Sequence, residues 1–194
     1  MSLFFLSGFL AAVMLFYLYY LGMQRYPAEL RFDLPNHFAE YKPSEDPLQP
    51  FGGPLSLSLS LKTKSSLGGI CSFELGGYLV DLRVQNAKVV LMFKVKSSKV
   101  VKLTLASQEN LVEGWNKIYL TLTRSSKQDL KVQLDLNGKS QTGEVKEVKG
   151  WPLTPSKILF GHLNFKGCMK DLYFCEDVVH ESNLVLINVI EGCD

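Results

Sequence analysis

Four lysines that lie close together are the first candidates for binding chemistry: Lys94, Lys96, Lys99 and Lys102. A turn at Ser97-Ser98 would place Lys96 opposite Lys99 in a hairpin, with Lys94 on the same face. Ammonium groups gathered in this way attract sulfated glycans, phospholipid head groups or acidic protein surfaces. The plainer interpretation is that the lysines stay in solvent and protect an edge hairpin from aggregation.

The cysteines are the second group with chemistry: Cys71, Cys168, Cys175 and Cys193. An even number of cysteines, in a chain that begins with an apolar targeting segment, predicts two disulfides and an oxidising compartment. A metal site is the alternative. No C-x-x-C motif occurs, however, and His180 is the only imidazole nearby, so we expect no metal.

The remaining polar residues do not indicate catalysis. Glu144 and Glu147 would point to opposite faces of a strand, whereas glycoside hydrolysis needs two carboxylates that flank one bond. The three histidines, His37, His162 and His180, stand in no nucleophile motif, and no phosphate-binding loop is present. We therefore expect no enzyme and no cofactor. A net charge of only +2 argues against a nucleic-acid partner.

The N-terminal segment is expected to anchor the chain in a membrane. Residues 3–23 are almost entirely apolar and uncharged, and about 20 such residues span a bilayer, so residues 1–23 are predicted to form a transmembrane helix that contacts membrane lipid. A cleaved signal peptide is the alternative, although bulky tyrosines stand where a small-residue cleavage site would be. Arg25 and Arg31 favour a cytoplasmic location for the rest of the chain. The cysteines favour an extracellular or luminal one.

Residues 24–54 hold six of the eight prolines and show little apolar periodicity, which predicts a stalk or linker. Its aromatic residues would either dock on a partner or pack on this chain's own domain. They are Phe32, Phe38, Tyr41 and Phe51.

Residues 55–194 alternate between apolar and polar side chains, which is typical of strands with one buried face. The clearest run is Leu55, Leu57, Leu59 and Leu61, and residues 118–122 and 130–136 repeat it. Asn137-Gly138 suits a two-residue hairpin turn, and Gly68-Gly69 is expected to separate two further strands. Short half-polar strands must pack to hide one face. The predicted fold is all-β, an antiparallel jelly-roll β-sandwich preceded by one N-terminal transmembrane helix.

Three places in this region contain motifs. Near the C-terminus stand Ile158-Leu-Phe-Gly161, Phe165-Lys-Gly-Cys-Met-Lys-Asp-Leu172 and Gly192-Cys193, in mid-chain stands Leu111-Val-Glu-Gly-Trp115, and Leu55 to Thr63 opens the region. They resemble the C-terminal signature, the mid-chain tryptophan motif and the first long strand of the laminin G-like family, which has the lectin- and glucanase-type sandwich. Asn116 stands in place of the family's usual histidine. The resemblance implies that Cys168 is joined to Cys193, which would leave Cys71 to pair with Cys175.

The resemblance also bears on calcium, which family members often bind at one rim of the sandwich. Gly77 stands where the family has an aspartate, and Asn164 could supply a second ligand. The principal carboxylate is missing, so we expect no calcium site. Trp115, at the start of a strand, is expected to fill one end of the sandwich.

Together these features predict a non-enzymatic recognition or adhesion module: a single-pass membrane protein that presents a laminin G-like domain, outside the cell or in a lumen. Its partner would be an acidic glycan or an extracellular protein, bound at Lys94, Lys96, Lys99 and Lys102. The alternative is an accessory or structural subunit of a larger membrane protein complex, whose β domain caps that complex.

Overall fold

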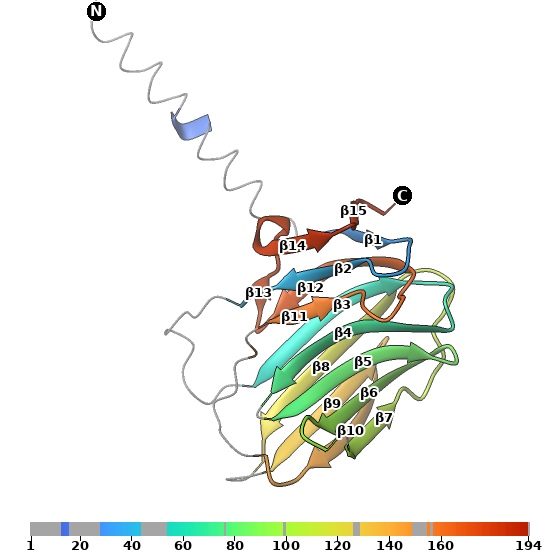
Figure 1. Cartoon of the computed structure of the whole chain (residues 1–194), viewed down its shortest axis with the longest axis vertical. Helices are drawn as coiled ribbons and strands as arrows, with labels where there is room; N and C mark the ends of the chain where they lie inside the picture. The colour runs from blue at the N-terminus through green and yellow to red at the C-terminus, as the bar shows by residue number, and fades with distance from the viewer. Residues whose placement is uncertain are drawn as a thin grey trace, which may run out of the picture.

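The computed structural model describes residues 13–15, 28–43, 54–75, 77–98, 100–125, 129–148, 155 and 157–193. From residue 28 onward these residues form two antiparallel sheets packed face to face (Figure 1). In spatial order, the eight-stranded sheet contains β10 (Lys139–Val145), β9 (Leu130–Leu136), β8 (Asn116–Arg124), β3 (Leu55–Lys62), β12 (Gly167–Phe174), β1 (Leu30–Phe32) and β15 (Ile190–Glu191), with β13 (Asp177–Val178) paired to β12. The seven-stranded sheet contains β14 (Leu184–Ile187), β2 (Phe38–Tyr41), β11 (Ile158–Phe160), β4 (Leu67–Leu75), β5 (Tyr78–Gln85), β6 (Lys88–Val95) and β7 (Val101–Ala106). A short 3₁₀ helix, Glu181–Asn183, precedes β14.

The core lies between the two sheets and confirms the predicted alternation. All four leucines of β3 are buried, as are the apolar residues of β8 and β9 at every second position. The facing sheet contributes large side chains such as Phe93 and Phe160. Because successive residues of a strand point to opposite faces, the polar residues between them lie on the outer faces of the sandwich.

Residues 28–43 belong to the sandwich, so the predicted stalk is wrong for this part of the chain. Leu30 and Phe32 are completely buried, and β1 pairs with both β12 and β15. Phe32 packs edge-on against Phe165, with ring centroids 5.6 Å apart. Two apolar residues that alternate with Arg31 suffice for a short inward-facing strand, a signal that the surrounding prolines obscured.

The other aromatic residues of the predicted stalk follow the same pattern. β2 pairs with β11 and β14, which buries Tyr41 and leaves Phe38 partly buried. These side chains therefore pack on this chain's own domain. Phe51 lies outside the described residues.

The predicted transmembrane helix falls almost wholly outside the described residues, of which only 13–15, a helical stretch, belong to it. Within the described part of the chain, no helix is both long and apolar enough to cross a membrane.

The two dipeptides predicted to lie between strands, Asn137-Gly138 and Gly68-Gly69, differ in their positions. Asn137 and Gly138 both have positive φ (51° and 84°) and turn β9 into β10, as predicted. Gly68-Gly69 does not separate strands. It lies inside β4, where the pairing with β5 shifts register between Gly69 and Cys71.

Replacing Phe32 by alanine should lower the free energy of unfolding by about 3–5 kcal/mol, because it opens a cavity in the core. Leu34, which is exposed in the turn after β1, provides the control, and Leu34→Ala should change it by less than about 0.5 kcal/mol. Urea denaturation of the full chain in detergent, followed by tryptophan fluorescence, measures both. Equal, small effects would contradict the assignment of β1 to the core.

Candidate functional site

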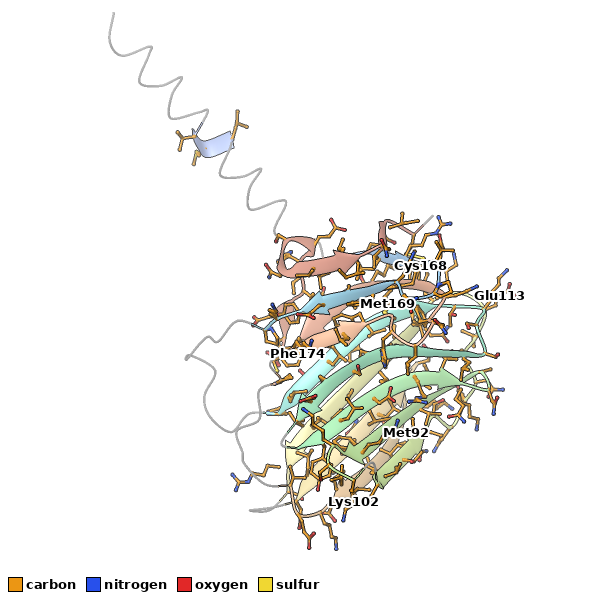
Figure 2. The ribbon with its side chains drawn as sticks, in the orientation of Figure 1. Met92, Lys102, Glu113, Cys168, Met169 and Phe174 are labelled. Carbon is orange, nitrogen blue, oxygen red and sulfur yellow. A yellow bond between two sulfur atoms is a disulfide. The ribbon has the colours of Figure 1, made fainter. Side chains whose placement is uncertain are left out.

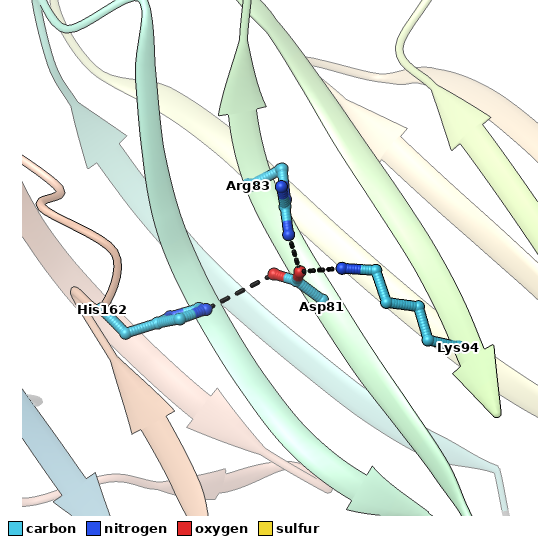
Figure 3. A network of polar contacts seen from close by, with 4 residues as sticks. All are labelled: Asp81, Arg83, Lys94 and His162. Atoms are coloured by element: carbon cyan, nitrogen blue, oxygen red, sulfur yellow. Dashed lines mark hydrogen bonds and ion pairs between the residues drawn. The ribbon is translucent and has the colours of Figure 1, made fainter. Parts of the chain in front are cut away.

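Asp81 of β5 is the centre of a polar network on the outer face of the seven-stranded sheet (Figure 3). Its side chain is only 3% exposed. Arg83, on the same strand, forms an ion pair with Oδ2, and Lys94 Nζ of β6 lies 3.1 Å from the same oxygen. His162 Nε2, from the loop after β11, lies 3.4 Å from Oδ1. The network therefore joins two neighbouring strands and one loop.

This arrangement determines the charge of Asp81. Burial alone would raise the pKa of its carboxyl group, but interactions with His162, Arg83 and Lys94 outweigh burial and hold that pKa well below the usual range of aspartate. The carboxylate is therefore ionised at physiological pH and is neutralised within the sheet. A general acid or base works best with a pKa near the working pH, so Asp81 suits a structural cross-link better than acid–base catalysis.

The position of His162 depends on Gly69. A Cβ atom on Gly69 would lie within 2.4–2.6 Å of three atoms of the imidazole ring, so only glycine leaves room for the ring over β4. The Gly69 N–H also donates to the His162 carbonyl oxygen at 2.9 Å. The sequence contains both residues, but no pattern joins them, and neither was predicted to belong to a site with Asp81.

The predicted lysine patch is only partly free. The hairpin forms, since the Val95 N–H donates to Val100 O at 2.8 Å. Lys94 is held by Asp81, and Lys96 Nζ lies 2.7 Å from Glu74 Oε2. Lys102 is exposed on β7, near the lower end of the sandwich in Figure 2. Lys99 lies outside the described residues. A ligand-binding role for these lysines stays a prediction.

One of the two implied disulfides is present. Cys168 and Cys193 are bonded, with Cα atoms 5.9 Å apart. Cys168 is on β12, near the upper end of the sandwich in Figure 2, and Cys193 follows β15, so the bond passes over β1, which lies between these strands. It therefore holds the N-terminal strand in the sheet.

The second implied disulfide is wrong, because Cys71 and Cys175 are not bonded to each other. Cys71 lies on β4 and is completely buried, and burial raises the pKa of its thiol. Cys175 lies in the turn between β12 and β13, in the other sheet.

Trp115 does not fill the end of the sandwich as expected. The completely buried residue is its neighbour Asn116, whose side chain accepts from the Val112 N–H at 2.9 Å and donates to the carbonyl oxygens of Val112 and Gly114. Because Asn116 points inward, Trp115 points outward and is only partly buried.

Two lysines lie over the outward-facing Trp115 ring. Lys170 Nζ is 4.3 Å and Lys62 Nζ is 5.9 Å from the ring centroid, which are cation–π distances. Within the described parts of the chain, neither ammonium group forms an ion pair. This cluster combines positive charge with a partly exposed aromatic ring, and the sequence showed no local pattern that would have predicted it.

Gly77 and Asn164 stand where the laminin G-like family has its calcium ligands, and the structure does not bring them together. Gly77 follows the end of β4, whereas the loop that holds Asn164 packs near the start of that strand, on Gly68 and Gly69. Among the described residues, no three His, Cys, Asp or Glu side chains gather closely enough to hold a metal ion.

No family model and no curated protein matches the sequence. Solved structures do. The LG1-3 region of the laminin α2 chain matches with a TM-score of 0.61 at 14% identity, over 87% of this chain and 35% of that one. Domains LG4-5 of the mouse laminin α1 chain match with a TM-score of 0.62 at 13% identity, over 87% and 48% of the two chains. This chain thus spans less than half of either laminin structure.

A sialidase module has a similar fold. The CBM40 of the Ruminococcus gnavus IT-sialidase matches with a TM-score of 0.53 at 14% identity, over 80% of this chain and 93% of that chain. The same module bound to α2,3-sialyllactose matches with a TM-score of 0.50 at 15% identity, over 80% and 92%. The protein therefore has a laminin G-like fold of the lectin-like sandwich class. At these identities the likeness shows the fold alone.

Replacing Asp81 by asparagine should lower the free energy of unfolding by about 1–3 kcal/mol, because it removes charge-assisted hydrogen bonds from a buried site. Since the pKa of Asp81 is lowered in the folded protein, its stabilising contribution is present above the ordinary aspartate pKa of about 3.9 and is lost as the pH falls below it. The difference in the free energy of unfolding between the unaltered chain and Asp81→Asn should therefore become smaller below about pH 4.

Glu74→Gln is the matched control for this experiment, because the Glu74–Lys96 pair is more than half exposed. It should change the free energy of unfolding by less than about 0.5 kcal/mol. Urea denaturation at a series of pH values measures both variants. If the difference in the free energy of unfolding between the unaltered chain and Asp81→Asn instead grows as the pH falls below about 4, the ionised network is contradicted.

Non-reducing peptide mapping of the native protein should recover Cys168 linked to Cys193, and no peptide that links Cys71 to Cys175. Alkylation before and after denaturation should show that Cys71 reacts only in the unfolded chain, because its thiol is completely buried and its pKa is raised. A 71–175 link, or rapid labelling of native Cys71, would contradict this assignment.

Proposed function

We propose that this protein is a non-catalytic recognition module that binds a glycan or a protein through an exposed sheet face. The cluster of Trp115, Lys62 and Lys170 carries the proposal, because it places two positive charges beside a partly exposed indole ring. Tryptophan is enriched where proteins bind partners, and neighbouring ammonium groups attract acidic ligands.

The fold supports a binding role. Among the similar solved structures are laminin LG regions and a CBM40 bound to α2,3-sialyllactose. Sialyllactose carries a carboxylate, and charge-assisted hydrogen bonds from lysine to such a group are stronger than neutral ones. An acidic glycan is therefore the ligand that best suits a surface with unpaired lysines. The exposed Lys102 of the hairpin gives a second surface for the same chemistry.

We also propose that the domain is extracellular or luminal and is anchored by residues 3–23. The Cys168–Cys193 disulfide supports this location, because structural disulfides persist in oxidising compartments. The Ala28 N–H donates to Val179 O at 3.0 Å, so the domain begins shortly after the predicted anchor ends at Met23. A domain held this closely would stand near the membrane surface.

The full chain, reconstituted in lipid nanodiscs, should bind sialylated or sulfated glycans on a printed array and should not bind their uncharged counterparts. Binding should weaken as salt rises, because the charges are at the surface. Empty nanodiscs are the control. If no glycan binds and the chain instead co-purifies with a polytopic protein from native membranes, the accessory-subunit alternative replaces this proposal.

A further inference from the structure

The outer face of the eight-stranded sheet has a strip of small side chains between two rows of larger ones. Ser56, Ser58 and Ser60 of β3 form this serine strip, since the leucines of that strand occupy the inner face. Tyr119 of β8 and Tyr173 of β12 pair with Ser58 from either side. Directly paired residues project from the same face, so the two tyrosines border the strip.

The next position along the strip has the same arrangement with basic residues. Lys117 of β8 and Lys170 of β12 both pair with Ser60. Trp115 and Lys62 follow at the end of the strip. The ammonium groups of Lys62 and Lys170 both lie over the Trp115 indole ring. The large residues that surround the serine strip define what we name the β3 surface: Lys62, Trp115, Lys117, Tyr119, Lys170 and Tyr173.

Two carboxylates on this face accept hydrogen bonds from donors of the chain itself. Asp171 Oδ2 accepts from Ser60 Oγ at 2.8 Å. Asp135, which pairs with Tyr119 from β9, accepts from Ser140 Oγ at 2.6 Å and from the Gly138 N–H at 2.9 Å. In contrast, the three lysines of the β3 surface form no ion pair with any described residue. These neutral donors leave Asp171 and Asp135 negatively charged, but the three lysines outnumber the two carboxylates, so this part of the face has a net charge of +1.

The dimensions of the β3 surface favour a narrow ligand. β8 and β12 both pair with β3, so they are about 10 Å apart across it. That width accommodates one extended saccharide chain, whereas a protein partner typically covers about 800 Å² on each side. Tyr119, which is 50% exposed, offers a ring face for the C–H face of a sugar, and the partly exposed Ser56 and Ser58 hydroxyls can donate to or accept from sugar hydroxyls.

We propose that the β3 surface binds an acidic saccharide laid along β3, with its carboxylate or sulfate groups held by Lys62, Lys117 and Lys170. The inference rests on the proposed recognition function and specifies the ligand class and the sheet face. It places the main contact on the sheet opposite the Lys94–Lys102 hairpin, whose first two lysines are neutralised by Asp81 and Glu74.

The test uses the full chain in nanodiscs with two acidic probes, a heparin octasaccharide and α2,3-sialyllactose, and with lactose as the uncharged reference. The double variant Lys62→Ser/Lys170→Ser should weaken binding of the octasaccharide about tenfold or more. Tyr119→Ala should weaken it about threefold or more. The matched control is Lys131→Ser/Lys146→Ser, which removes the same charge from exposed lysines outside the β3 surface and the hairpin, and should change binding less than about twofold.

Near-ultraviolet circular dichroism and the urea midpoint confirm that each variant is folded. Equal loss in both double variants would show that only overall charge matters and would overturn the inference. Loss in the control alone would move the site to other lysines, overturning this inference but leaving the proposed function intact. Equally strong competition by poly-L-glutamate would replace the saccharide by an acidic protein. If the unaltered chain binds neither acidic saccharide, the inference fails, and the proposed function then stands only if the chain captures a protein ligand.

Discussion

Burial of one apolar face on each sheet is the constraint on which the rest of the structure depends. β3 shows it most simply, with a leucine buried at every second position. Each such side chain contributes about 1.5–3 kcal/mol when removed from water, and a single sheet offers nowhere to bury it. The second sheet meets this need with residues such as Phe93 and Phe160. Because the inner faces are committed to burial, residues for recognition must lie on the outer faces and loops.

The same constraint explains why the sandwich extends into the proline-rich segment. β1 inserts between β12 and β15, and its Leu30 and Phe32 complete the core. A three-residue strand is short, and the Cys168–Cys193 bond passes over it from one neighbour to the other. The disulfide closes a loop with a sequence separation of 25 residues, which stabilises the fold by roughly 3 kcal/mol in the loop-entropy model. The strands β1 and β15 are therefore held together in the sheet.

The two outer faces use charge in different ways. On the seven-stranded sheet, Asp81 is buried under its own cations, so the charges there hold strands and a loop together. On the eight-stranded sheet, the lysines around Trp115 have no carboxylate partner in the described chain, so their charge remains available to a ligand. The hairpin lysines singled out from the sequence belong mainly to the first kind. A count of lysines in the sequence cannot distinguish lysines that cross-link strands from lysines that can bind a ligand. The difference depends on which carboxylates the folded sheet places beside each lysine.

By itself, the sequence determined which face of each strand is apolar, that Asn137-Gly138 turns a hairpin, and, through a short C-terminal signature, that Cys168 pairs with Cys193. These features depend on near neighbours along the chain or on one motif. Only the tertiary structure decided that residues 28–43 join the sheets, that His162 lies on Gly69, and that Lys170 and Lys62 meet over Trp115. Such contacts join residues far apart in the chain. They follow from the order and register of the strands, which a period-two pattern leaves open because any two half-apolar strands could pair.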